Sequence, residues 1–114
     1  MLNLLPTIKN RKDFLDITKN GLLSPQYGLV LQCKINNEHD IRIGITATKK
    51  IGNAVTRNRC KRKLRTVAND ILKNFAHKNN DYVLIARNTT YDRDINLLKE
   101  DLIKALKKIK KYKN

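Results

Sequence analysis

The feature that most restricts the fold of this chain is an amphipathic helix in its middle. The apolar positions of this segment follow the 3.6-residue helical period without a miss. They are Cys60, Leu64, Val67, Ala68, Ile71, Leu72 and Phe75. Asn53 is well placed to cap the start of the helix. This helix is therefore the element that the sequence determines best.

Two segments with a two-residue period precede the helix and predict strands. In the segment Tyr27–Ile35 every second residue is apolar, and the segment Ile41–Thr48 has the same pattern. A polar stretch, NNEHD, separates the two. We expect the two strands to form an antiparallel pair with one buried face and one open, polar face.

The remaining elements complete a single domain, residues 1–114. A first helix is expected from Asn10 to Gly21, a strand covered on both faces at Tyr82–Ala86, and a last helix from about Asp94 to Lys111. Strand, helix and strand in that order suggest a parallel crossover. The fold class predicted is α+β, a two-layer α/β sandwich with a mixed sheet and the order α-β-β-(β)-α-β-α, in which the bracketed strand is optional.

Charge points to a polyanionic partner. The 114 residues hold 25 Lys and Arg against 10 Asp and Glu, a net charge of +15. Such an excess opposes compaction, and nucleic acid is the usual partner that offsets it, with a membrane surface a weaker alternative. No secretory signal and no run long enough to span a membrane are read from the sequence, which predicts a cytoplasmic protein.

Cysteine and histidine offer no evident site chemistry. Cys33 and Cys60 lie far apart on apolar faces and are interpreted as inert core thiols. His39 and His77 are isolated, so no metal site is predicted.

The positive charge is concentrated at the start of the middle helix. The stretch TRNRCKRKLRT, residues 56–66, surrounds the first turns with Lys and Arg, and no acidic residue occurs between Asp40 and Asp70. A merely solvated helix would mix the two signs of charge. Just before the helix, Lys49, Lys50 and Gly52 stand beside its free N–H groups, an arrangement suited to bind phosphate.

These residues resemble a known family. The stretch RIGITATKKIGNAVTRNRCKRKLR is similar to the signature of the protein subunit of bacterial ribonuclease P, with its Arg-Asn-Arg core at residues 57–59. KDF at residues 12–14 and DYVLIAR at residues 81–87 extend the resemblance in order along the chain. It implies an α/β sandwich whose crossover around the basic helix is left-handed, an exception to the usual rule.

The resemblance also implies a function. The RNA subunit would hydrolyse the phosphodiester bond that releases the 5′ leader of precursor tRNA, with Mg²⁺ held by the RNA. The protein would bind the ribonuclease P RNA and the leader, with no catalytic residue, no bound cofactor, and neither DNA nor membrane as partner. The RNA-facing residues expected are Lys49, Lys50, Asn53, Arg57, Asn58, Arg59, Lys61, Arg62 and Arg65.

A cleft for the leader is expected on the open sheet face, between the first helix and the basic helix. Its candidate residues are Phe14, Val30, Gln32 and Thr46, with Lys61 and Arg65 at its edge. Ordinary core packing is the competing interpretation of Phe14. Many members of the family carry further aromatics where Thr18 and Gln32 stand here, so leader binding is expected to depend more on charge and hydrogen bonds.

Two other classes of protein fit part of the pattern. A ribosomal or RNA-chaperone-like binding module would have the same composition and charge, and only the ordered signature disfavours it. A helix-turn-helix DNA-binding protein fits less well, because a buried strand follows the basic helix and no short helix pair precedes it.

Overall fold

The computed structural model describes residues 4–113 and has the predicted α+β class. Its elements follow in the order α1 (Arg11–Asn20), β1 (Leu22–Pro25), β2 (Leu29–Ile35), β3 (Ile41–Thr46), the short 3₁₀ turn η1 (Lys49–Ile51), α2 (Ala54–Phe75), β4 (Asn80–Ala86) and α3 (Ile95–Lys108). The short strand β1 gives three strands before α2, but it comes first among them, whereas the predicted order placed the optional strand last.

The sheet corrects one prediction. Its strand order is β1-β2-β4-β3, so β2 and β3 are not neighbours. β4 lies between them, antiparallel to β2 and parallel to β3. The expected antiparallel pairing of β2 with β3 is wrong, because alternation in a sequence reports which face is buried and not which strand lies alongside. The predicted parallel crossover from β3 through α2 to β4 is confirmed.

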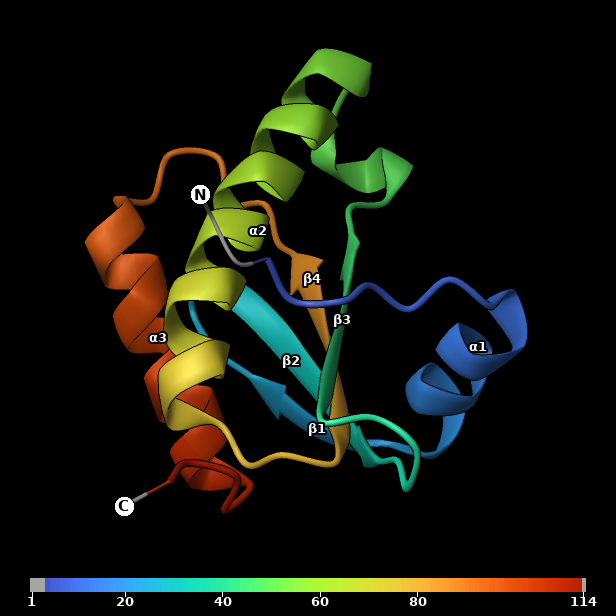
Figure 1. Cartoon of the computed structure of the whole chain (residues 1–114). Helices are drawn as coiled ribbons and strands as arrows, with labels where there is room; N and C mark the ends of the chain where they lie inside the picture. The colour runs from blue at the N-terminus through green and yellow to red at the C-terminus, as the bar shows by residue number, and fades with distance from the viewer. Residues whose placement is uncertain (1–3, 114) are drawn as a thin grey trace.

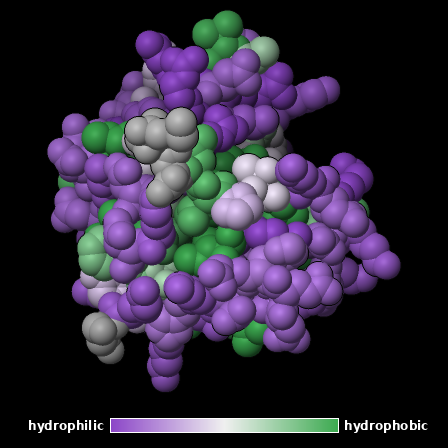
Figure 2. All heavy atoms as spheres, in the orientation of Figure 1, coloured by the Kyte–Doolittle hydropathy of each residue, from purple (hydrophilic) through white to green (hydrophobic). Residues whose placement is uncertain are grey.

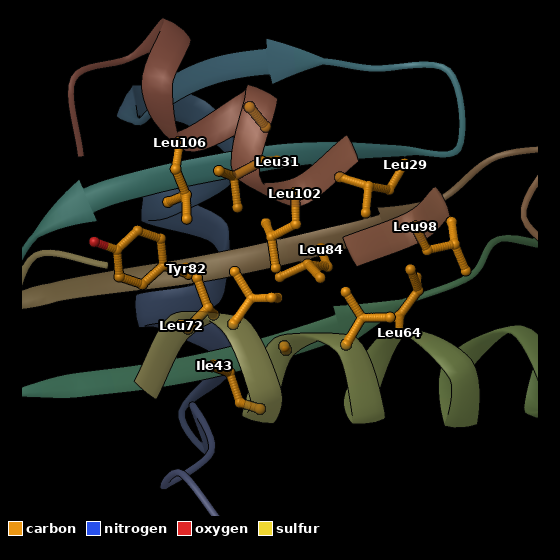
Figure 3. Close-up of a cluster of buried hydrophobic side chains, with 14 of the residues drawn as sticks. Leu29, Leu31, Ile43, Leu64, Leu72, Tyr82, Leu84, Leu98, Leu102 and Leu106 are labelled. Atoms are coloured by element: carbon orange, nitrogen blue, oxygen red, sulfur yellow. The ribbon is translucent and has the colours of Figure 1, made fainter. Parts of the chain in front are cut away.

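One face of the sheet is covered by α2 and α3, and the apolar core lies between these two layers (Figure 1). Leucines from both helices point toward the apolar residues of β2, β3 and β4 in the core (Figure 3). Leu64 and Leu72 of α2 and Leu102 of α3 are fully buried there. Both cysteines are free and buried in the same core, as predicted.

The opposite face is partly covered by α1, which lies on the other side of the sheet from α2 and α3 (Figure 1). Only Ile17 of this helix is buried. Phe14 lies against Gly44 of β3, where an added Cβ would come within 2.7 Å of the Phe14 ring. The face is therefore open only where α1 does not reach.

Some predicted boundaries shift by a few residues. β2 begins at Leu29, and Tyr27 is 64% exposed in the preceding turn. β3 ends at Thr46, two residues early, and α3 ends at Lys108. The first two helices are capped as expected, by Asn10 and Asn53.

Candidate RNA interface

The start of α2 is built by its cap and the turn before it. The side-chain oxygen of Asn53 accepts a hydrogen bond from the Thr56 N–H at 2.9 Å. Gly52 has a φ of 147°, in the region that disfavours a side chain. This conformation turns η1 back against α2 and leaves Lys49 and Lys50 exposed beside the helix start.

The cations of the first turns of α2 lack acidic partners. Asn58, Arg59, Arg62 and Arg65 are exposed, whereas Arg57 and Lys61 are half-buried. Within residues 4–113 none of the lysines and arginines predicted to face RNA forms an ion pair. The ion pairs lie elsewhere and join Lys34 to Asp16, Arg42 to Asp13 and Asp81, Arg93 to Asp101, Lys99 to Asp70, and His39 to Glu38. The positive charge at the start of α2 is thus not neutralised by carboxylates within the described residues.

Arg57 carries a hydrogen-bond donor that is not satisfied within residues 4–113. Its Nε is buried and has no hydrogen-bond partner in the described structure. A buried N–H without an acceptor costs about 1–3 kcal/mol, so such groups are usually satisfied. Because this atom is shielded from solvent, a phosphate oxygen could accept from it only after the Arg57 side chain moved.

Lys63 belongs to the same basic stretch and has a different role. Its Nζ donates hydrogen bonds to the backbone carbonyls of Thr90 and Tyr91, at 3.1 and 2.9 Å, and to that of Arg93. Lys63 therefore ties the loop between β4 and α3 to α2. In the sequence Lys63 is only one more cation of the stretch 56–66, because nothing local indicates that a distant loop meets it.

The exposed part of the sheet face that carries α1 is a row of three residues, one from each of three neighbouring strands. Strand register places Val30, Ile85 and Thr46 side by side, and all three are partly exposed. The next row, Gln32, Val83 and Gly44, is buried under α1. The predicted cleft residues thus share one face, but Gln32 is only 7% exposed and donates to the Thr18 carbonyl at 3.1 Å.

Ile85 was missed as a member of the row, because its strand was interpreted as covered on both faces. That interpretation holds for most of β4, where every residue except Ile85 is buried. The places of Lys61 and Arg65 at the edge of the cleft stay a prediction.

The carboxylates on and beside α1 have a structural role. The Arg42 guanidinium binds both oxygens of Asp81, at 2.9 and 2.6 Å, and reaches Asp13 at 3.4 Å. The hydrogen bond from Lys34 lowers the pKa of Asp16 below its usual value. The lowered pKa favours the ionised form of Asp16, which is the wrong state for a general acid.

Residues 4–113 contain no group of three His, Cys, Asp or Glu side chains that could hold a metal ion. No helix within that range is both long and apolar enough to cross a bilayer.

A sandwich that presents an unneutralised basic helix start beside a half-open sheet face defines the class of the protein, an α+β RNA-binding domain. Comparison with known proteins narrows the class. The family model for ribonuclease P matches residues 5–110. The "Ribonuclease P protein component" of Erythrobacter litoralis is 40% identical over 106 residues, which are 93% of this chain and 87% of that protein.

Solved structures agree. The ribonuclease P protein of Staphylococcus aureus superposes with a TM-score of 0.77 at 33% identity and covers 93% of this chain and 96% of its own. That of Thermotoga maritima gives 0.76 at 28% identity and covers 90% and 96%. The chain belongs to the ribonuclease P protein family, the protein components of the endoribonuclease that matures the 5′ ends of tRNA.

Proposed function

We propose that the start of α2 binds ribonuclease P RNA and that the row Val30, Ile85 and Thr46 holds the 5′ leader of precursor tRNA. The observation that carries the first part is the set of cations on α2 and η1 without carboxylate partners. A chain that kept these charges for its own stability would pair them, as it pairs Arg42 and Arg93.

The leader site rests on geometry and on proximity to the basic helix start. A single strand needs an apolar surface on which bases can lie and cations that follow its phosphates. The row offers two aliphatic side chains and one hydroxyl at the end of the sheet from which η1 and α2 continue. Because no aromatic residue lies in the row, base contacts there are weaker than ring stacking.

The chemistry is assigned to the RNA subunit. The protein's part is to neutralise phosphates and hold substrate, and Mg²⁺ held by the RNA would supply activation of the nucleophile. The complex acts where tRNA precursors are made, the cytoplasm of a bacterial cell.

Binding to ribonuclease P RNA across a range of salt concentrations tests the basic surface. Replacing Arg57 and Arg59 with Ala should weaken binding and lower the log–log salt slope by roughly 0.7–0.9 for each lost phosphate contact. The matched control is a double Ala variant at Lys104 and Lys108, which removes the same charge from an exposed part of α3. Equal effects of the two variants would mean that binding follows net charge and that α2 has no special place in it.

Cleavage by the reconstituted complex tests the leader site. A Val30→Glu variant should raise the KM for precursor tRNA with a long leader and leave a precursor with a one-nucleotide leader unaffected. Leu97→Glu, an exposed apolar residue of α3, is the control. Loss for both precursors would place Val30 outside the leader path. The protein freed of RNA should not cleave either precursor.

A further inference from the structure

Arg59 differs from the other cations predicted to face RNA. Its guanidinium donates from Nη1 to the hydroxyl of Tyr91 at 3.0 Å and lies 5.7 Å from the centre of that ring. None of the other lysines and arginines in that set has a side-chain partner among the described residues. A long arginine side chain that is free must lose rotamer freedom on binding, whereas one already held does not.

Tyr91 is itself fixed. Its ring packs against the core, and it lies in the loop between β4 and α3. The loop is fastened to the sheet by the buried Thr90, whose hydroxyl donates to the Gly28 carbonyl at 2.6 Å and accepts from the Arg87 N–H at 2.8 Å. From the other side Lys63 of α2 holds the carbonyls of Thr90, Tyr91 and Arg93.

Holding this loop explains why one lysine of the basic stretch is directed at backbone carbonyl groups. Lys63 follows Arg59 by one helical turn, so the same face of α2 carries the clamp and the cation that the clamped loop supports. The Nζ of Lys63 has three carbonyl acceptors, which is its full donor capacity. It has no N–H left for a phosphate.

We infer that Tyr91 is a positioning residue for Arg59 and that Lys63 acts in RNA binding through the loop, not through contact with a phosphate. The tyrosine hydroxyl and ring hold the guanidinium at the surface of α2 in the orientation that a phosphate of the ribonuclease P RNA requires. This inference rests on the proposal that the start of α2 binds that RNA.

A double-mutant cycle tests the first part. Tyr91→Phe keeps the ring and the net charge and removes only the hydroxyl, so the thermal midpoint should change little. Affinity for ribonuclease P RNA should fall roughly two- to tenfold, the range of one lost hydrogen bond. In an Arg59→Ala background the same substitution should have no further effect. Equal loss in both backgrounds would make Tyr91 an RNA contact of its own, and no loss in either would make the pair purely structural; both outcomes overturn the inference.

The salt slope tests the second part. Lys63→Met should weaken binding, speed hydrogen exchange of the loop amides and leave the log–log slope unchanged. Arg59→Ala, in contrast, should lower the slope by roughly 0.7–0.9. A slope lowered equally by Lys63→Met would assign Lys63 to a phosphate and overturn its role as a clamp. If Arg59→Ala itself leaves affinity and slope unchanged, the proposed RNA surface fails, a result separate from any effect of Tyr91.

Discussion

The identity of some single residues in this domain is set by the side chains that pack against them. Gly44 is buried in β3, and the ring of Phe14 occupies the space that a side chain would need. This contact is how α1 reaches β3, since only Ile17 of the helix is buried. The contact also favours packing over an exposed stacking role for most of the Phe14 ring.

Gly44→Ala should lower the free energy of unfolding by about 1–3 kcal/mol, because the added methyl group forces Phe14 out of its place. Urea denaturation measures the loss. Phe14→Leu in the same chain should restore part of it, since the ring that clashes is gone. A change within about 0.5 kcal/mol for the single variant would mean that α1 is not seated on Gly44 in solution.

The buried thiols should be chemically silent. Burial raises the pKa of Cys33 to about 12 and also raises that of Cys60. Because the thiolate is the reactive form, neither should react with a thiol reagent at pH 8 until the chain unfolds. A folded pKa above the unfolded value means stability that is present below about pH 9 and lost as pH rises toward 12. Rapid labelling of the native protein would contradict this prediction.

At the scale of elements, the end of α3 shows how a helix stops without a glycine. Lys110 adopts a positive φ of 60°, and the Lys111 N–H donates to the Leu106 carbonyl at 2.8 Å. The tail then returns to the end of α2, where the Tyr112 ring stacks on Phe75 at 5.6 Å between centroids. The Lys-rich C-terminal segment is thus a clasp between the two helices of one layer.

Tyr112→Ala should release this clasp. The lost stacking and the lost contact with Lys107, whose Nζ lies 4.8 Å from the ring, should together lower the free energy of unfolding by about 1–2 kcal/mol. Amide hydrogen exchange at Ala76 and His77, which the tail covers, should quicken more than exchange at β4. Uniform quickening would indicate general destabilisation without a local clasp.

At the scale of the whole molecule, charge is the dominant property. A net charge of +15 on 114 residues opposes folding through repulsion, and the face in Figure 2 is mostly hydrophilic with an apolar strip near its middle. Screening by salt relieves part of the repulsion. A bound anion at the start of α2 would relieve more, because it adds contacts that only the folded chain offers.

Phosphate or sulfate should therefore raise the thermal midpoint more than chloride at matched ionic strength. An anion at about 100 times its dissociation constant adds roughly 2.7 kcal/mol by linkage. The excess should vanish in a triple Ala variant at Lys49, Lys50 and Arg57 and persist in the Lys104 and Lys108 control. Equal thermal midpoints in all salts would mean that screening is the only effect of the anions and would contradict a preformed phosphate site.

The sequence by itself determined the local properties of this protein. Helical period and caps predicted α2 nearly to the residue, and alternation predicted the core-facing residues of β2 and β3 except Ile35, which is 63% exposed. The acid-free basic stretch predicts an RNA-binding surface, and this stays a prediction. Each of these properties depends on residues that are only a few positions apart in the sequence. The boundary of α3 was missed because Lys110, not glycine, takes the left-handed conformation.

Only the tertiary structure decided which segments meet. β4 enters between β2 and β3, α1 buries Gln32 and leaves Val30, Ile85 and Thr46 open, and Lys63 meets carbonyls 27 or more residues away. A periodic pattern fixes which side of an element is apolar and says nothing about the element that covers it. The choice among neighbours depends on contacts between distant residues, which form only when the whole core is packed.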